Sequence, residues 1–280
     1  MDEEVVEERF TTHRGRRLRF LTGGSGPALL LCHGFLGSAE NFETWFGELA
    51  AVRTLIVPDL PGFGASEPLM GRHTSDALAG AVAAVADAVG AVEFDVGGLC
   101  LGASVAQSLL RRRPGAVRRL ILHTPLLAPG LVRRRFHVQA AMMTAPGIFR
   151  TITWLSRRRT VSDLYKRLMV EGDDVDPRAA RINFENQCRA HPRAAREWLR
   201  DGLARDDVAA LRERREPTLV IAARNDRIAD ADALARVVAG LPLVELALVD
   251  DAGHGWTQAY VRRQLLILTR FLDAPVTART

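Results

Sequence analysis

Cysteine is scarce in this sequence, and neither a secretory leader nor a long hydrophobic run is evident. Cys32, Cys100 and Cys188 are an odd number at wide, irregular spacing, which suits a reduced chain better than a disulfide framework or a metal site. The acidic start MDEEVVEE lacks the features of a signal peptide, and no apolar run is long enough to span a bilayer. We therefore expect a cytoplasmic protein that needs no metal or cofactor and does not insert stably into membranes.

Lysine is almost absent as well, since Lys166 is the only one. The formal net charge is nevertheless +5. The positive charge is therefore carried by arginine, with runs at 111–113, 133–135 and 157–159. These runs have no interleaved aromatic residues, and solvated helix faces account for them better than contacts to phosphates. The charge pattern thus argues against a nucleic-acid partner.

Hydrophobic residues make up 48% of the 280 residues, which is enough for one large core domain. Apolar runs of strand length alternate with helical stretches, and this alternation predicts an α/β fold with a mostly parallel sheet and helices on both faces. A hairpin is expected at the leading edge, around 16–21. The other predicted strands are 28–32, 54–58, 94–97, 120–123, 218–222 and 243–249, and the predicted helices of the core are 41–50, 76–89, 103–113, 231–239 and 257–272.

One long interval between two core strands interrupts this alternation and shows only helical patterns. A helical block in that place is most simply a cap over the carboxyl ends of the strands, where open α/β sheets bind their ligands. We therefore predict a core of residues 1–125 and 217–280, with a helical cap (lid) of residues 126–216 inserted before the last core strands. The predicted cap helices are 131–143, 147–157, 161–169, 177–189 and 192–203.

The stretch GGLCLGAS at 97–104 has the form of a sharp strand-to-helix turn built around one reactive side chain. Gly98 and Gly102 flank the central residue, because side chains there would collide with the neighbouring strand and helix. The turn exposes Cys100 at the head of the following helix, where main-chain N–H groups and the helix dipole favour a thiolate. Cys100 is therefore the predicted nucleophile.

A nucleophile of this kind needs a base, and the base needs an orienting carboxylate. His254 is the best base, because it lies in the glycine-bounded loop DAGHG that follows the last predicted strand. Asp226 is the best acid, because it closes AARND at the carboxyl end of the strand before that one; Asp230 and Asp251 are the alternatives. All three groups are expected on loops at one edge of the sheet, in the chain order nucleophile, acid, histidine.

Five short motifs together resemble the α/β-hydrolase fold family, in a cap-bearing form with cysteine in place of the common serine at the elbow. In chain order they are HGFL, DLPGFGAS, GGLCLG, RND and AGHG. The resemblance implies that the main-chain N–H groups of Phe35 and Leu101 hold the developing oxyanion, with Leu36 as the alternative donor on the first loop. His33 is expected to support that loop by hydrogen bonding rather than to act as a base.

The substrate is indicated only indirectly, by the apolar content of the cap. A lid that buries an apolar acyl group and a lid that merely packs on the core both need apolar faces. We predict substrate contacts from Leu36, His123, Met142 and Trp154, although for His123 strand-end packing is an equal alternative. The expected partner is a small-molecule acyl substrate, with an acyl carrier or a CoA thioester as further candidates.

These features predict an acyl-group hydrolase, acting on an ester, thioester or lactone through a Cys-His-Asp triad and an acyl-cysteine intermediate. Two alternatives remain open at this point. The first is an acyltransferase or cyclase that uses the same triad, because thioesters transfer acyl groups readily to amines, alcohols and thiols. The other is a non-catalytic binding protein that kept the pocket and lost the chemistry.

Overall fold

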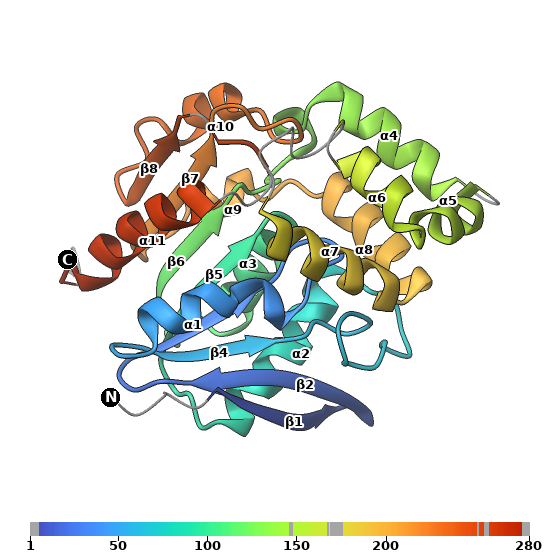
Figure 1. The fold of residues 1–280 in the computed structure, drawn as a ribbon. Helices are drawn as coiled ribbons and strands as arrows, with labels where there is room; N and C mark the ends of the chain where they lie inside the picture. Colours follow the sequence, from blue (N-terminus) through green and yellow to red (C-terminus); the bar gives the residue numbers. More distant parts are fainter. Residues whose placement is uncertain are drawn as a thin grey trace.

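An eight-stranded sheet runs through the centre of the molecule (Figure 1). The computed structural model describes residues 6–145, 148–166, 168, 176–250, 252–254 and 258–275. The strand order is β1-β2-β4-β3-β5-β6-β7-β8, antiparallel between β1, β2 and β4 and parallel from β4 to β8. The strands are β1 (Glu7–His13), β2 (Arg16–Gly23), β3 (Ala28–Cys32), β4 (Thr54–Pro58), β5 (Phe94–Leu99), β6 (Val117–His123), β7 (Thr218–Ala223) and β8 (Val244–Val249).

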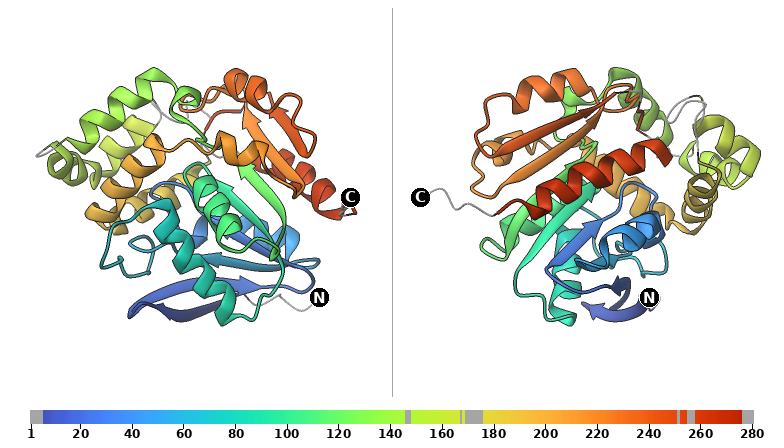
Figure 2. Two further views of the ribbon diagram at one scale, coloured as in Figure 1. Left: turned by 180° about the vertical axis from the view of Figure 1, so that it is seen from behind. Right: turned by 60° about the vertical axis from the view of Figure 1, so that its left-hand side comes forward.

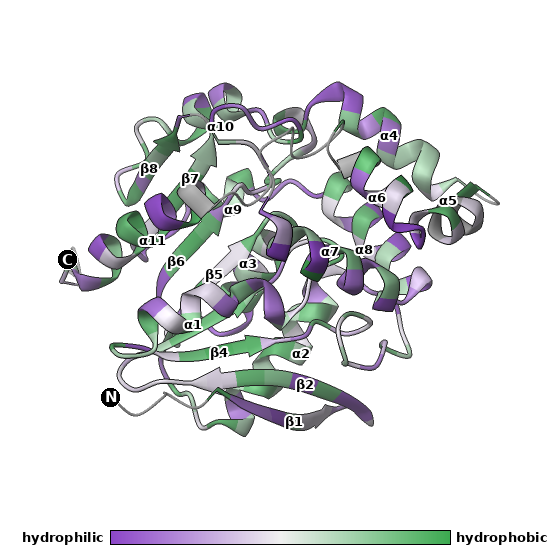
Figure 3. Ribbon diagram, in the orientation of Figure 1, coloured by the Kyte–Doolittle hydropathy of each residue, from purple (hydrophilic) through white to green (hydrophobic). Residues whose placement is uncertain are grey.

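Helices cover both faces of the sheet because the central strands are apolar on both sides. In β3, Leu30 and Cys32 join the core under one layer of helices, whereas Leu29 and Leu31 join the core under the other. Figure 3 shows the hydrophobic residues gathered along the inner strands, with hydrophilic residues on the edge strand β1. One layer holds α2 (Ser75–Ala88), α3 (Gly102–Arg112) and α10 (Ala231–Val238), and the other holds α1 (Glu43–Leu49) and α11 (Gln258–Asp273).

The segment between β6 and β7 is helical and lies to one side of the sheet (Figures 1 and 2). Its buried Phe136 and Trp198 belong to the same hydrophobic cluster as α2 and α3, so it packs on the core rather than forming a core of its own. The helices are α4 (Arg134–Thr144), α5 (Ile148–Ser156), α6 (Arg159–Lys166), α7 (Pro177–Arg189), α8 (Pro192–Ala204) and α9 (Val208–Arg212).

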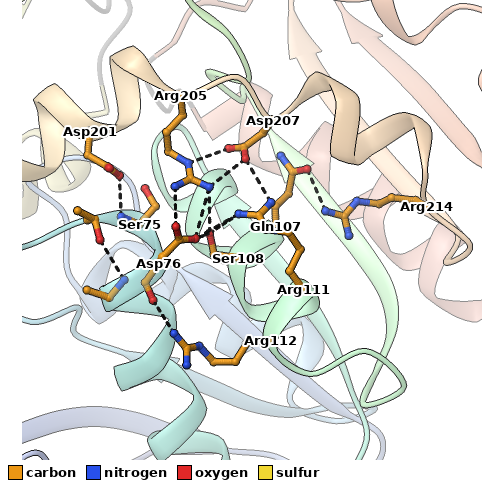
Figure 4. A network of polar contacts seen from close by, with 12 residues as sticks. Ser75, Asp76, Gln107, Ser108, Arg111, Arg112, Asp201, Arg205, Asp207 and Arg214 are labelled. Carbon is orange, nitrogen blue, oxygen red and sulfur yellow. Dashed lines mark hydrogen bonds and ion pairs between the residues drawn. The ribbon is translucent and has the colours of Figure 1, made fainter.

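Ion pairs fasten the C-terminal end of this segment to α2 and α3 (Figure 4). Arg205, just after α8, contacts Asp207 at 3.1 Å and Asp76 of α2 at 3.2 Å. Asp207 also accepts from Arg111 of α3 at 3.3 Å. The end of the cap is thereby tied to the helix that follows Cys100.

The predicted strands and helices agree with the structure to within a few residues, and the expected hairpin at the leading edge is formed by β1 and β2. The five-residue helix α9 was not indicated by the sequence patterns. The predicted helix ends at 147, 169 and 257 lie outside the described residues. None of the described helices combines the length and apolar content that a membrane span requires.

Candidate active site

Cys100 occupies a tight turn between β5 and α3. Its φ of +53° lies in the left-handed region, and its N–H donates to the carbonyl of His123 at 2.9 Å. A Cβ on Gly98 would lie 2.2 Å from the carbonyl oxygen of Gly102, and one on Gly102 would lie 2.4 Å from that of His33. The two glycines are therefore required by close backbone approach, as the sequence predicts, and the turn presents a half-buried Cys100 at the head of α3.

Asp226 follows β7 and is held by its own turn. One carboxylate oxygen, Oδ1, accepts from the N–H groups of Ile228 at 2.6 Å and Ala229 at 2.9 Å, and the residue is 2% exposed. The other oxygen, Oδ2, lies 2.7 Å from Nδ1 of His254. The alternative acid Asp230 instead caps α10 by accepting from the N–H of Ala233, and Asp251 lies outside the described residues.

His254 joins the other two residues. Nδ1 is hydrogen-bonded to Asp226, which leaves Nε2 as the ring nitrogen available to Cys100. Burial opposes protonation of the imidazole, but the Asp226 carboxylate, Cys100 and the hydrogen bonds to both raise the pKa of His254 well above its usual value. The structure thus brings together Cys100, His254 and Asp226, with a base that readily holds a proton between two partners.

The loop after β3 runs beside the turn of Cys100. A Cβ on Gly34 would lie 3.2 Å from Cβ of Cys100, so this loop approaches the nucleophile closely. The main-chain N–H groups of Phe35 and Leu101 have no acceptor within the described residues, which leaves both available to an oxyanion. The same is true of Leu36, whose φ is +58°, so Leu36 stays the alternative donor.

His33 supports this loop from below. It is fully buried, its Nδ1 donates to the carbonyl of Gly34 at 2.8 Å, and its Nε2 accepts from the N–H of Leu60 at 2.9 Å. Both ring nitrogens are therefore engaged by the main chain, which agrees with the expected structural role.

His123, at the end of β6, lies in a buried polar cluster with two residues of α11. Its Nε2 contacts the hydroxyl of Tyr260 at 2.9 Å and also the side-chain amide of Gln264. Burial, and secondarily the charge of His254, lowers the pKa of His123 to about 3. A neutral histidine that is 1% exposed favours the packing alternative over substrate contact. A glutamine four residues after a tyrosine on the buried face of α11 is the signal that would have predicted this cluster.

The cap residue beside the oxyanion loop is Trp198 of α8, which the sequence patterns did not single out. It is fully buried, and its ring centroid lies 6.5 Å from that of Phe35 and 5.2 Å from that of Phe63. The predicted substrate contacts Met142 and Trp154, in contrast, are 59% and 56% exposed. Their role in binding stays a prediction, whereas Trp198 lies against the loop that carries Phe35.

The start of the cap is clasped to the loop that carries Asp226. Val132 and Ala229 form an antiparallel bridge, and the N–H of Arg133 donates to the carbonyl of Ile228 at 2.8 Å. The guanidinium Nε of Arg133 also donates to the main-chain carbonyl of Asp226 at 2.8 Å. The first residues of the cap therefore help to fix the acid that orients His254.

Arg133→Ala is expected to lower kcat roughly fivefold with little change in KM, because the loss of one hydrogen bond, about 1 kcal/mol, loosens Asp226 without removing its carboxylate. The apparent pKa assigned to His254 should fall at the same time. Steady-state kinetics across a pH series measures both quantities. Arg134→Ala removes the neighbouring exposed arginine and serves as the control; an equal effect in both variants would exclude the positioning role.

No group of three or more His, Cys, Asp or Glu side chains converges as metal ligands among the residues for which the structure gives positions. The arrangement at Cys100 instead brings a thiol, an imidazole and a carboxylate together, with N–H groups beside them that have no acceptor among the described residues. Such a set is suited to attack on a carbonyl carbon.

Known proteins resemble this chain over most of its length. A family model described as alpha/beta hydrolase fold matches residues 27–255, a range that contains Cys100, Asp226 and His254. The 2-hydroxymuconate semialdehyde hydrolase of Pseudomonas putida is 30% identical over 252 residues, which cover 87% of this chain and 86% of the relative.

Solved structures resemble the chain over nearly its full length. A thermophilic esterase from Thermogutta terrifontis aligns with 96% of this chain and 98% of its own, at a TM-score of 0.76 and 22% identity. The enol-lactonase from Burkholderia xenovorans LB400 aligns with 95% of this chain and 100% of its own, at a TM-score of 0.77 and 17% identity. At these identities the likeness concerns the fold.

Proposed function

Because the chain belongs to the alpha/beta hydrolase fold family and is an enzyme of the hydrolase class, we propose that it cleaves small acyl compounds through Cys100, His254 and Asp226. The predicted fold, a mostly parallel sheet with helices on both faces, is confirmed. The observation that carries the proposal is the position of His254, whose Nδ1 is hydrogen-bonded to Asp226 and whose pKa is raised by both Asp226 and Cys100.

In the first step the thiol proton of Cys100 passes to Nε2 of His254, and Sγ attacks the carbonyl carbon of the substrate. The carbon–oxygen double bond opens, and the resulting oxyanion accepts hydrogen bonds from the N–H groups of Phe35 and Leu101. Asp226 stabilises the imidazolium that forms, in keeping with the raised pKa of His254. The bond to the leaving group then breaks, the leaving group takes the proton from His254, and a thioester on Cys100 remains.

In the second step the acyl group leaves Cys100. Neutral His254 removes a proton from a water molecule, whose oxygen attacks the thioester carbon. The carbon–sulfur bond breaks as the tetrahedral intermediate collapses, and the proton on His254 returns to the sulfur. The thiol is restored and a carboxylic acid is released.

We propose a substrate with one reactive carbonyl group and an apolar acyl part, which includes esters, thioesters and lactones. The names of the relatives support this range, because they include a hydrolase of 2-hydroxymuconate semialdehyde, an esterase and an enol-lactonase. Buried Trp198 packs against Phe35 and so helps to hold the loop that carries this proposed oxyanion donor. An acyl carrier or CoA thioester as the source of the acyl group remains part of the proposal.

The cysteine itself supports acyl transfer as a second candidate function. A thioester reacts readily with amines, alcohols and thiols, and the side chains of His254 and Asp226 are only 10% and 1% exposed, which limits access of water. The hydrogen bond between His254 and Asp226 beside Cys100 argues against the third alternative, a binding protein without catalysis, because such a protein has no need of it.

The acyl intermediate is tested by intact-protein mass spectrometry after brief incubation with p-nitrophenyl esters, acyl thioesters and lactones. We expect a mass increase equal to the acyl group, mapped by peptide digestion to Cys100. Addition of an alcohol or amine acceptor then separates the two candidate functions, since a hydrolase releases the acid and a transferase yields the acceptor adduct. Turnover with an adduct on another residue would refute the assignment of Cys100.

A further inference from the structure

A groove lies outside the residues placed in catalysis. α2 packs beside β1 (Figure 2), and a groove of about 660 Å³ opens between α2, the turn of the β1–β2 hairpin, the loop around 69–72 and the end of α3. Its floor is made by Ala77, Gly80, Ala83 and Ala84 of α2. Five arginines, Arg14, Arg16, Arg72, Arg112 and Arg113, also line the groove, which gives it a positive charge.

Three of these arginines have no anionic partner. Arg14 and Arg72 make no hydrogen bond or ion pair within the described residues, and Arg112 donates only to the main-chain carbonyl of Asp76, as Figure 4 shows. The two carboxylates of the groove are neutralised by other arginines. Asp76 pairs with Arg205 and Arg111, and Asp87 pairs with Arg113. Three uncompensated guanidinium groups therefore line one groove.

Arg14 lies at a position that hairpins seldom give to arginine. The pairing of His13 with Arg16 leaves a two-residue turn, and Arg14 and Gly15 have φ of +50° and +72°. This type I′ geometry favours Asn-Gly or Asp-Gly, so an arginine at the first position lowers the stability of the turn. Because its guanidinium makes no hydrogen bond or ion pair with a described residue, it is available to a ligand.

Gly80 is a second residue of the groove that lowers the stability of the fold, here the stability of helix α2. Glycine inside a helix is less stable than alanine, and the nearest atoms to a Cβ on Gly80 would be those of Arg112 and His13, at an ordinary contact distance of 3.7 Å. Packing therefore does not require the glycine. Its effect is to leave the floor open between the two side chains that flank it.

We propose that this groove binds the polyphosphate and base of a nucleoside diphosphate or triphosphate. The guanidinium group of arginine can bind two phosphate oxygens at once. Three arginines without an ion-pair partner carry more positive charge than a ligand with a single carboxylate would neutralise, so a ligand with several negative charges fits better. The floor of small side chains accepts the flat face of a base, and Met70, which is 74% exposed, lies at its edge. The volume is within the range of small-ligand sites. This inference does not depend on the reaction at Cys100.

The test is isothermal titration of the full chain with ADP at low salt, with pyrophosphate and adenosine as partial ligands. Arg14→Asn is the decisive variant, since asparagine suits the turn better and should not lower the midpoint of thermal unfolding. We expect ADP affinity to fall at least tenfold in Arg14→Asn and in Arg72→Gln, and to be lost in Gly80→Leu, which fills the floor.

Arg236→Gln is the control, because it removes one exposed arginine from α10, outside the groove. Absence of ADP binding would overturn the proposal, as would an equal loss of affinity in Arg236→Gln and Arg14→Asn. Pyrophosphate binding as tightly as ADP would overturn the assignment of a nucleotide, because the floor would then contribute nothing.

Discussion

Replacing Cys100 by alanine is expected to lower kcat for ester and thioester hydrolysis by about 10⁴- to 10⁶-fold, the range seen when a triad nucleophile is removed. The N–H groups of Phe35 and Leu101 remain in the variant and account for its residual activity. Both residues carry a Cβ, so the left-handed turn at φ +53° is equally strained and the fold is expected to persist. Initial rates with p-nitrophenyl esters and the midpoint of thermal unfolding measure the two effects.

Two further variants make the result specific to the thiol. Cys188→Ala removes a half-buried cysteine of α7 and should keep full activity, and burial raises the pKa of Cys32 to about 12, so that thiol stays protonated. Cys100→Ser replaces the thiol by a hydroxyl group that His254 can deprotonate, so this variant should lose less activity than Cys100→Ala. Turnover by Cys100→Ala at a rate near that of the unchanged chain would show that the nucleophile lies elsewhere.

The turn at Cys100 and the approach of Asp226 to His254 can be predicted from the sequence, because each residue stands in a short motif that follows a strand. The turn at Cys100 requires Gly98, which closely approaches Gly102 within the same motif, and Gly102, which also approaches the carbonyl of His33 on the loop after β3. The loops of Asp226 and His254 follow neighbouring parallel strands, β7 and β8, so their approach follows from the topology.

The contacts that surround these residues could not be predicted in the same way, because they join segments far apart in the chain. Trp198 reaches Phe35 only through the packing of α8 on the core. The arginine run at 133–135 reads as a solvated charge, yet Arg133 bonds the carbonyl of Asp226, 93 positions later in the chain. Periodicity predicts which face of a helix is buried, but it does not predict the helix or loop on which that face packs.

Asp226→Asn is expected to lower kcat by about 10³- to 10⁴-fold, because asparagine still has an oxygen for the N–H groups of Ile228 and Ala229 but no charge to stabilise the imidazolium. Asp230→Asn is the matched control, since Asp230 caps α10 and asparagine is an equally good cap. Equal activity of the two variants would reassign the acid.

The same substitution has a predictable effect on the pH dependence. Burial alone would lower the pKa of His254, and the Asp226 carboxylate, Cys100 and their hydrogen bonds raise it, so the pKa should fall when the carboxylate is lost. The limb of kcat/KM that reports His254 should therefore move to lower pH in Asp226→Asn. His123, with a pKa of about 3, is neutral on both limbs and does not contribute.

Stability should follow the same linkage. A histidine whose pKa is raised on folding stabilises the native state below its unfolded pKa of about 6.5, and this contribution is lost as the pH rises through the higher folded value. The difference in free energy of unfolding between the unchanged chain and Asp226→Asn should thus be larger at pH 6 than at high pH. Urea denaturation at the two pH values measures it, and a difference that grows with pH would contradict a protonated His254 held by Asp226.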